Sequence, residues 1–279
     1  PEVYQLSPDT VIDEVGKALD LGVHSFLLFG IPSHKDATGS SALEENGIVP
    51  QAIRAIRKKH GDKPYLITDE CFCEYTDHGH CGILNEKTGK LDLDGDATLP
   101  LLARQCVVHA QSGADMVAPS GMLDGMVGAI RKGLDGAGFS HLPIMSYSAK
   151  YASAYYGPFR DAIGSSVTLT GDKRTYQMDF GNSDEALREA ELDIAEGADM
   201  IMVKPGLPYL DVIRLLKDQL GIPSNIPPQV IGAIQDLYTQ QLSYAQNLNP
   251  QSNDRSYQQK EVKQYLETRT KVRHLIHSH

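Results

Sequence analysis

Short apolar runs alternate with longer amphipathic segments along most of the chain. Six of these runs are bounded by turn residues and have the length of buried strands. The strand candidates are His24–Gly30, Tyr65–Cys71, Asp115–Ser120, Pro143–Ser148, Tyr176–Asp179 and Asp199–Pro205. The helix candidates are Pro50–His60, Leu99–Ser112, Leu123–Ala137, Asp184–Glu196 and Pro208–Leu220. Strand and helix repeat at roughly thirty-residue spacing, which predicts a parallel α/β sheet.

The repeated βα units favour a (β/α)8 barrel of the TIM type over an open dinucleotide-binding sheet. No glycine-rich fingerprint follows the first strand. Gly113-Ala114-Asp115 and Gly197-Ala198-Asp199 each suit a left-handed helix end followed by the start of a strand. In such a barrel, chemistry collects at the carboxyl ends of the strands. The polar residues at these ends are Asp69, Ser120, Lys150 and Lys204.

The character of the sequence changes beyond about Gly221. Residues 219–279 hold ten of the fifteen Gln and no Phe. Ile226–Ala245 and Tyr257–Ile276 have helical patterns, and no seventh or eighth strand is evident. We therefore expect a catalytic barrel domain of six βα units in residues 1–218. Residues 219–279 are expected to form a divergent helical tail of unknown role.

Composition narrows the class of protein. The 279 residues carry a formal net charge of −10, which argues against a nucleic-acid or membrane-surface partner. No run of apolar residues is long enough to cross a bilayer, and the first ten residues do not resemble a secretory signal. The missing initial Met suggests that an upstream segment is absent. Clustered cysteines without an export signal predict a metal site in a reducing, cytoplasmic compartment.

The strongest chemical signal is the segment from Cys71 to Cys81, which also contains Cys73, His78 and His80. Zinc prefers thiolate and imidazole ligands in tetrahedral geometry, so three thiolates can leave a fourth position open for water or substrate. A closed structural site with either His as fourth ligand is one alternative, and incidental buried thiols are another. The fourth cysteine, Cys106, lies in an apolar helical segment and is expected in the core.

Two strand candidates end in lysine within similar apolar contexts, Met145–Lys150 and Met200–Lys204. Two ammonium groups that lie close together depress each other's pKa, and a lysine so depressed is a free amine that can attack a ketone. A single lysine of this kind is more often a salt-bridge partner. Two of them on alternate strands favour Schiff-base chemistry.

A basic loop follows the first of these lysines. Arg160, Lys173 and Arg174 can bind a substrate carboxylate through charge-assisted hydrogen bonds, or can form a solvated surface. Tyr155 and Tyr156 precede them and can wall a pocket or simply pack.

Several segments resemble one family, the porphobilinogen synthases or 5-aminolevulinate dehydratases. The matching stretches are DECFCEYTDHGHCG, APSGMLDG, MSYSAKYASAYYGPFRD, GDKRTYQ and EGADMIMVKPGLPYLD, and they cover roughly residues 1–218 in family order. The resemblance implies a (β/α)8 barrel and a homo-octamer. It also implies a lyase of tetrapyrrole (heme) synthesis that condenses two 5-aminolevulinates to porphobilinogen with loss of two waters.

The resemblance also implies roles for individual residues. Lys204 matches the Schiff-base lysine for one substrate and Lys150 matches its partner for the second. The remaining matches are Cys71, Cys73 and Cys81 for the catalytic zinc, Asp69 and Ser120 near the reacting centre, and Arg160, Lys173, Gln177, Tyr156 and Phe159 around the second substrate. The family usually has Arg at the position of Lys173. Glu189 falls where some members bind an allosteric Mg²⁺, and an exposed helical Glu is the alternative. The family's mobile active-site segments correspond in this sequence to Ser33–Asn46 and Ala154–Phe159.

The resemblance stops before the family's last two strands, which supply Ser and Tyr groups for the first substrate. Residues after Pro223 do not match them, and the family's N-terminal arm is absent as well. The alternatives are therefore a truncated or degenerate relative that acts as a zinc-stabilised binding protein, or a Schiff-base aldolase. An aldolase needs Lys204 without the cysteines, whereas a binding protein needs the cysteines without the lysines.

Overall fold

The computed structural model describes residues 4–87, 89–162, 169 and 171–220. All of them belong to one compact unit, Tyr4–Tyr238, while a second unit of Pro1–Val3 and Thr239–His279 lies outside the described residues. The helices expected at Ile226–Ala245 and Tyr257–Ile276 likewise lie outside them. All helices and strands of the described residues therefore lie in the first unit.

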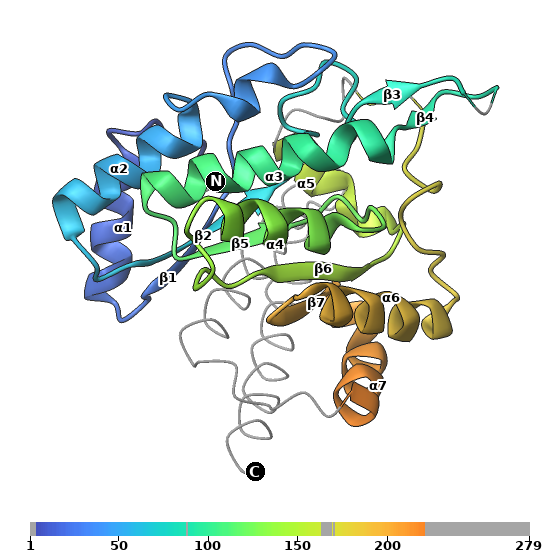
Figure 1. Ribbon diagram of the computed structural model, residues 1–279. Coiled ribbons are helices and arrows are strands. Elements are labelled where there is room, and N and C mark those ends of the chain that lie inside the picture. Colours follow the sequence, from blue (N-terminus) through green and yellow to red (C-terminus); the bar gives the residue numbers. More distant parts are fainter. Residues whose placement is uncertain (1–3, 88, 163–168, 170, 221–279) are drawn as a thin grey trace, which may run out of the picture. The chain divides into compact units, whose positions relative to one another are not determined.

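Five parallel strands form the inner layer of the described residues (Figure 1). They are β1 (Ser25–Leu28), β2 (Tyr65–Glu70), β5 (Met116–Pro119), β6 (Met145–Lys150) and β7 (Met200–Lys204). β2 pairs with β1 and β5, and β6 pairs with β7. A single parallel bridge between Val117 and Ile144 joins β5 to the residue before β6. The strands therefore follow one another in chain order, as they do in the wall of a barrel.

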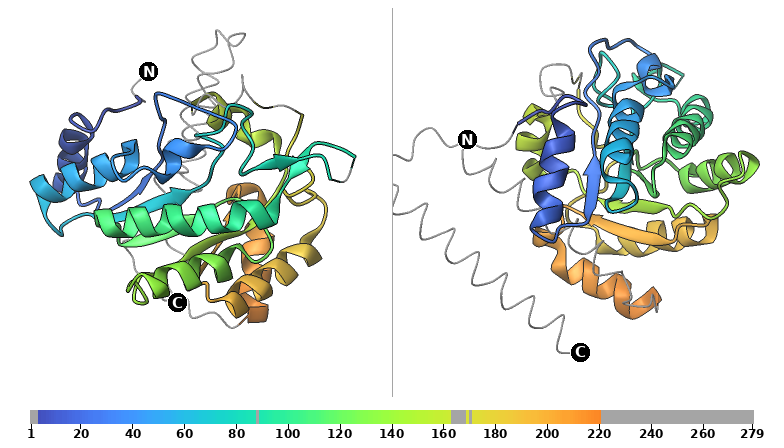
Figure 2. Two further views of the ribbon diagram at one scale, coloured as in Figure 1. Left: turned by 45° about the horizontal axis from the view of Figure 1, so that its top comes forward. Right: turned by 90° about the vertical axis from the view of Figure 1, so that its left-hand side faces the viewer.

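The helices form the outer layer, and each one contacts the next in chain order. They are α1 (Val11–Asp20), α2 (Ile48–His60), α3 (Gly95–Ser112), α4 (Met126–Gly136), α6 (Ser183–Glu196) and α7 (Leu210–Leu220). The right-hand view of Figure 2 shows these helices succeeding one another around the outside of the strands. This confirms the expected α/β architecture of the TIM-barrel type. None of the described helices is long and apolar enough to span a membrane.

Shorter elements connect this framework. They are η1 (Ser40–Leu43), the hairpin of β3 (Leu84–Asn85) and β4 (Asp92–Leu93), η2 (Ala154–Tyr156), α5 (Gly157–Ala162) and η3 (Leu207–Tyr209). The hairpin and α1 were not anticipated from the apolar pattern. Strands of two residues are too short to show any periodicity, and α1 carries only one fully buried side chain, Val15.

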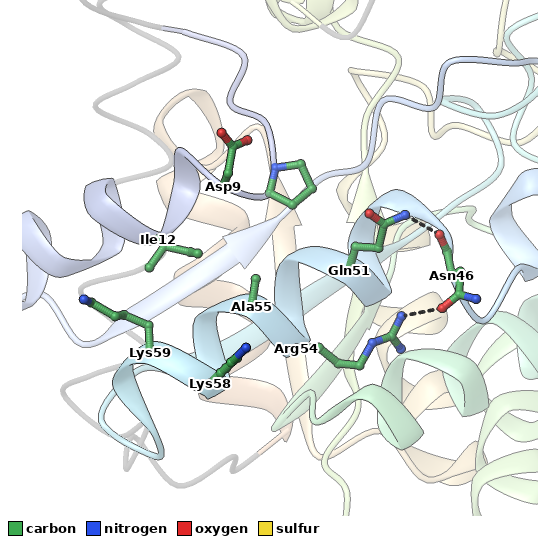
Figure 3. Close-up of a pocket in the computed structure, with 9 residues that line it drawn as sticks. Asp9, Ile12, Asn46, Gln51, Arg54, Ala55, Lys58 and Lys59 are labelled. Carbon is green, nitrogen blue, oxygen red and sulfur yellow. Dashed lines mark hydrogen bonds between the residues drawn. The ribbon is translucent and has the colours of Figure 1, made fainter.

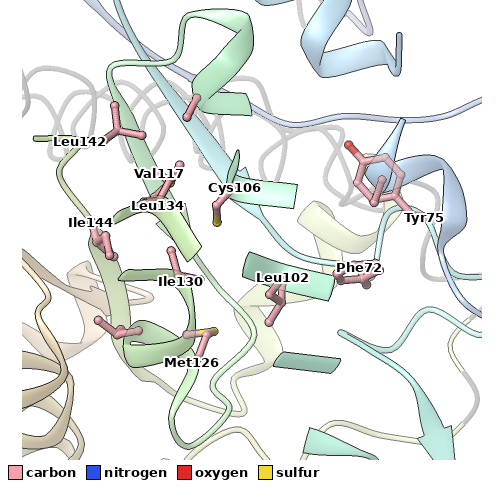
Figure 4. Packing of buried hydrophobic residues seen from close by; sticks show 13 residues of the cluster. Phe72, Tyr75, Leu102, Cys106, Val117, Met126, Ile130, Leu134, Leu142 and Ile144 are labelled. Atoms are coloured by element: carbon pink, nitrogen blue, oxygen red, sulfur yellow. The ribbon is translucent and has the colours of Figure 1, made fainter. Parts of the chain in front are cut away.

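Side chains alternate between the two faces of β2, because successive Cβ atoms of a strand point to opposite sides. Ile67 packs inward with Met116, Met145, Tyr147 and Met202. Leu66 packs outward against residues of α1 and α2. A third cluster fills the layer between α3, α4 and β5, where Leu102, Cys106 and Ile130 are fully buried (Figure 4). Cys106 is therefore a core residue, as expected.

The two Gly-Ala-Asp triplets end helices in the predicted way. Gly113 and Gly197 close α3 and α6 with φ of 106° and 107°, in the left-handed region that favours glycine. The carboxylate of Asp115 accepts a hydrogen bond from Leu66 N at 2.7 Å, and that of Asp199 accepts one from Ile144 N at 2.9 Å. Each Asp thus fastens the start of its own strand to the neighbouring strand.

Arg57 on α2 provides a test of this fastening. Its guanidinium donates to Gly113 O at 3.0 Å and Pro64 O at 2.8 Å, and it pairs with Asp115. We expect Arg57→Ala to lower the free energy of unfolding by about 2–4 kcal/mol, because partly buried acceptors lose their donor. Urea unfolding measures the change. Lys58→Ala, one residue away and exposed, should stay within about 0.5 kcal/mol. Equal effects of the two substitutions would contradict the role of Arg57.

One strand prediction is wrong. Tyr176–Asp179 forms no strand, and only Met178 makes an isolated parallel bridge, to Tyr151. The preceding residues form a turn in which Lys173 O accepts hydrogen bonds from Tyr176 N at 3.3 Å and Gln177 N at 2.8 Å. The turn prevents an extended ladder, and β6 is already paired with β7. The described residues therefore contain five βα-type strands in place of the expected six.

Candidate active site

The two strand-end lysines lie side by side. In the ladder of β6 and β7, Lys150 and Lys204 are direct register partners. Both side chains are largely buried, at 8% and 9% exposure. Their Nζ atoms lie 5.4 Å and 4.9 Å from the centre of the same Tyr147 ring. We call this ring the Tyr147 floor, because both amines lie over it. The face of an aromatic ring stabilises the ammonium form of a nearby amine.

An irregularity in β6 turns Lys150 towards this floor. The register with β7 shifts between Ser146 and Ala149. Tyr147 faces the inner cluster of the barrel, whereas Ala149 packs into the outer cluster with residues of α6. Without the shift, strict alternation would place Lys150 on the face opposite to Tyr147. A β-bulge changes which side chains share a face, so Lys150 and Tyr147 come together.

The surroundings of Lys204 favour the unprotonated, nucleophilic form of its amine. Burial and the nearby charge of Lys150 lower the pKa of Lys204 from 10.5 to about 8. About a tenth of the Lys204 side chains are therefore unprotonated at pH 7, and about half at pH 8. The pKa of Asp69 is raised to about 8, first by burial and then by the carboxylate of Glu74. Asp69 can accordingly exchange a proton in the same pH range.

These values give a pH-dependent prediction. As pH rises through about 8, Lys204 loses its proton, so its capture of a ketone should increase over this interval. Lys150→Met removes the charge that lowers the pKa of Lys204, and the midpoint should move upward by roughly 0.5–1 pH unit. Mass spectrometry of the borohydride-reduced Lys204 adduct, followed across pH, measures the midpoint. Replacement of the exposed Lys17 by Met should leave it in place, and an unchanged midpoint in Lys150→Met would refute the electrostatic coupling.

Asp69 and Ser120 lie beside the lysines, at the ends of β2 and β5. Ser120 Oγ donates to the carboxylate of Asp69 at 3.2 Å, and Lys150 Nζ donates to Ser120 O at 2.7 Å. The other carboxylate oxygen, Asp69 Oδ1, is buried and lacks a hydrogen-bond partner within the described chain. An orphaned buried oxygen in a cluster of reactive groups is available to a substrate proton.

The three clustered cysteines converge on one point. The Sγ atoms of Cys71, Cys73 and Cys81 all lie within 4.8 Å of one another, and they form the one metal-ligand group found among the described residues. All three side chains are buried free thiols. Hydrogen bonds from Cys71 and Cys73 lower the pKa of Cys81 well below its ordinary value. Three buried sulfurs at this separation fit a thiophilic divalent ion.

Lys173 lies next to the three sulfurs, whereas the sequence suggested His78 or His80 as a possible fourth ligand. His80 Nδ1 pairs with Tyr176 OH at 3.0 Å, and His78 Nε2 lies 3.2 Å from Ala37 O. Neither imidazole is grouped with the sulfurs as a metal ligand. Lys173 Nζ instead lies 3.4 Å from Cys81 Sγ, and thiolate charge raises the pKa of Lys173 against the opposing effect of burial. A buried ammonium offsets part of the negative charge of the thiolates.

The residues expected around the second substrate are only partly brought together. Lys173 and Gln177 are buried on one turn, and Gln177 Oε1 has no partner within the described residues. Tyr156 is buried with its ring 5.9 Å from Lys150 Nζ. Arg160 lies on α5 and is partly exposed. Phe159 is on the same short helix, but its side chain lies outside the described residues.

The segment Ser33–Asn46 is attached to the cysteine loop. Asp36 forms a parallel bridge with Thr76, and Asp36 O accepts a hydrogen bond from Asp77 N at 3.1 Å. The Asp36 carboxylate caps the following turn through Thr38 and Ser40, which lowers the pKa of Asp36 well below its ordinary value. These contacts fix Asp36 against the loop that carries the three cysteines, and the mobility expected of the segment from the family resemblance stays a prediction.

Glu189 lies away from this centre, on α6. Its side chain is partly buried, and burial followed by the charge of Asp124 raises its pKa. Within the described residues it belongs to no group of three potential metal ligands. Two further residues at the main site were not identified from the sequence, the Tyr147 floor and the buried Glu74. Neither has a spacing that separates it from ordinary core or surface residues.

A groove of about 690 Å³ lies between the start of α1 and α2. Asp9, Arg54, Lys58 and Lys59 contribute to its lining (Figure 3). Arg54 is tied to Asn46 Oδ1 at 3.1 Å and to Glu45 O at 2.8 Å. The groove contains none of the lysines, cysteines or carboxylates described above, so it is separate from the candidate active site.

Comparison with known proteins identifies the family of this chain. The sequence model of the family described as delta-aminolevulinic acid dehydratase matches residues 1–232. The enzyme of that name from Archaeoglobus fulgidus is 52% identical over 223 residues, which is 80% of this chain and 67% of the relative. That from Halalkalibacterium halodurans is 54% identical over 223 residues, which is 80% of this chain and 66% of the relative.

A solved structure of the same family is also similar to this chain. The crystal structure of delta-aminolevulinic acid dehydratase (porphobilinogen synthase) from Toxoplasma gondii, in complex with the product porphobilinogen, has a TM-score of 0.74 and 39% identity. The match covers 87% of this chain and 69% of that one. This chain spans about two thirds of the length of these relatives. It belongs to the delta-aminolevulinic acid dehydratase family, the lyases also called porphobilinogen synthases.

Proposed function

We propose that this chain catalyses the porphobilinogen synthase reaction, in which two 5-aminolevulinates condense to a pyrrole with loss of two waters. The observation that carries the proposal is the pairing of Lys150 with Lys204 over one aromatic ring, beside three convergent thiols. The reaction needs two captured ketones close together, and two adjacent buried amines supply this arrangement.

Each lysine is proposed to capture one substrate. The unprotonated Nζ attacks the ketone carbon, the resulting carbinolamine loses water, and the Schiff base that forms withdraws electrons from the adjacent carbons. Lys204, with its lowered pKa, is the amine for one substrate. Lys150, 2.7 Å from Ser120 O, is proposed to hold the other. Burial around both amines limits the access of water that would hydrolyse the adducts.

Asp69 and Ser120 are proposed to handle protons beside the Schiff bases. A carboxyl group with a pKa of about 8 can give a proton to a departing hydroxyl and take one from a carbon acid in the same pH range. Ser120 Oγ at 3.2 Å holds one oxygen of Asp69 in place and leaves Oδ1 for the substrate.

Cys71, Cys73 and Cys81 are proposed to hold zinc. Three thiolates would favour zinc over harder divalent ions. When bound, the ion supplies a Lewis acid next to the second substrate. The protein itself provides Lys173, whose ammonium lies 3.4 Å from Cys81 Sγ and stabilises the thiolate form.

The carboxylate of the second substrate is proposed to bind near Lys173, Gln177 and Arg160, with Tyr156 and Phe159 as apolar walls. Tyr156 OH is buried without a partner in the described residues, so it can donate a hydrogen bond to this carboxylate, whereas the equally unpartnered Gln177 Oε1 can only accept one from another substrate group. Lys173 offers a point charge in place of the planar fork of an Arg, which gives less directional binding of a carboxylate.

A paired experiment tests this proposal and separates it from its two alternatives. Purified protein is supplied with zinc and 5-aminolevulinate and assayed for porphobilinogen, and in parallel it is reduced with borohydride. Product together with labelled Lys204 supports the proposal. Labelling without zinc dependence would indicate an aldolase-type enzyme, and bound zinc without labelling would indicate a binding protein.

The remaining family properties are also proposals for this chain. We propose a homo-octamer, a cytoplasmic enzyme of tetrapyrrole (heme) synthesis, and an allosteric Mg²⁺ held with the help of Glu189. The free thiols fit a reducing compartment. The proximity of Asp124 to Glu189 supplies a second carboxylate for a hard cation. Light scattering with and without Mg²⁺ tests the assembly and its dependence on the ion.

A further inference from the structure

A buried polar pair lies on the outer face of β2, directly behind the proposed active site. His109 Nδ1 and Glu70 Oε1 are 2.8 Å apart, with side-chain exposures of 1% and 0%. Thr68 Oγ1 donates to the same carboxylate oxygen at 2.5 Å. The layer around them is otherwise apolar, since Leu102 and Cys106 of α3 pack there (Figure 4). Polar groups in such a layer are costly to bury and need a compensating function.

The position of Glu70 in the chain connects this pair to the chemistry. Glu70 stands between Asp69 and Cys71, whose side chains belong to the inner cluster of reactive groups. Side chains alternate along a strand, so Glu70 points outward and Asp69 and Cys71 point inward. The three residues are consecutive in the backbone, so a shift of one shifts the others. Any displacement of Glu70 relative to α3 therefore displaces the carboxylate and the first metal-ligand sulfur.

A second contact from the same helix fastens the next residue. Gln105 is fully buried, and its Nε2 donates to Cys71 O at 3.3 Å. Gln105 and His109 are four residues apart on α3, so they lie on one face of the helix. Together they hold two consecutive residues of the strand end. Apolar packing alone tolerates sliding between a helix and a strand, whereas directional hydrogen bonds fix one register.

We propose that Gln105 and His109 are positioning residues, which hold the Asp69–Cys73 segment in the geometry needed for metal binding and for the proposed reaction. Their contacts are with Cys71 O and the Glu70 carboxylate, so they act through the strand. The part of this proposal that concerns catalysis rests on the proposed function. The part that concerns the geometry of the three sulfurs does not.

The test uses the full-length chain and cobalt(II) as a spectroscopic probe of the three sulfurs. Gln105→Met keeps the length of the side chain without the donor, and His109→Leu removes the partner of Glu70. We expect each to weaken cobalt binding and to lower kcat by about 10- to 100-fold, with a smaller change in KM. The intensity of the thiolate-to-cobalt absorption bands, followed during titration, reports the change independently of turnover. His109→Asn retains a donor near the position of Nδ1 and should restore most of both properties.

A stability control separates positioning from general packing. Ile130→Val removes one methylene from the same apolar layer on α4, away from the β2 end. It should lower the thermal midpoint without altering the cobalt spectrum. If His109→Leu and Gln105→Met also leave the cobalt bands and kcat unchanged, the two residues are ordinary core residues and the proposal is overturned. If the parent chain makes no porphobilinogen, the cobalt titration still decides the geometric claim.

Discussion

Replacement of Lys204 by Met is expected to abolish both porphobilinogen formation and borohydride trapping at this position. The change keeps an unbranched side chain of similar volume over the Tyr147 ring but removes the amine that attacks the ketone. We expect a loss of kcat on the order of 10⁴-fold or more, the scale that follows removal of a covalent nucleophile. A colorimetric product assay and intact-protein mass spectrometry measure the two effects.

Two comparisons show whether the effect is specific to Lys204, one with the neighbouring Lys150 and one with a surface lysine. Lys204→Met leaves Lys150 in place, so any residual adduct at Lys150 can be mapped by peptide mass spectrometry. Lys58→Met replaces an exposed lysine on α2 and should retain full activity. Turnover by Lys204→Met above about 1% of the parent rate would exclude the role assigned to Lys204.

Replacement of Cys81 by Ser is expected to empty the metal site. Cys81 has the most thiolate character of the three, since Cys71 and Cys73 donate to it and Lys173 lies at 3.4 Å. A serine hydroxyl does not ionise near neutral pH and is a poor ligand for zinc. Activity should fall about 10³-fold, because a Lewis acid contributes several kcal/mol to the transition state. Chelation of the parent protein should produce the same loss reversibly.

The fourth cysteine is the matched control. Cys106→Ala removes a buried thiol from α3 with no effect on the three convergent sulfurs. After incubation with zinc it should retain as much zinc as the parent protein, measured by inductively coupled plasma mass spectrometry, while its thermal midpoint falls by a few degrees. Full activity of Cys81→Ser in a metal-free buffer would show that the sulfurs have no part in catalysis.

Much of the architecture could be predicted because the helices have a clear hydrophobic period and the inner strands are short apolar runs bounded by turn residues. The pattern of Pro50–His60 predicts a helix that corresponds to α2, and the two Gly-Ala-Asp triplets end helices as expected. The strand prediction for Tyr176–Asp179 is wrong. Its short apolar run has a strand-like composition, but hydrogen bonds to Lys173 O bend the chain into a turn. The apolar pattern of this segment does not show that turn hydrogen bonds compete with strand pairing.

The candidate site was predictable to a similar degree. Clustered cysteines and strand-end lysines are visible as motifs, because metal binding and Schiff-base formation each require particular side chains. The polar pair of Glu70 and His109 was not anticipated, although His109 stands in an apolar helical segment. The two residues are distant in the chain, so only the packing of α3 on β2 brings them together.

By itself, the sequence determined which residues stand at the carboxyl ends of the strands, because alternation of apolar runs and helices sets that spacing. It did not determine which way Lys150 faces. Regular alternation from Tyr147 would turn Lys150 outward, and the register shift between Ser146 and Ala149 turns it inward, beside Lys204. That shift arises from the fit of β6 against β7, an interaction between distant segments. The tertiary structure alone therefore decided that the two amines share one floor.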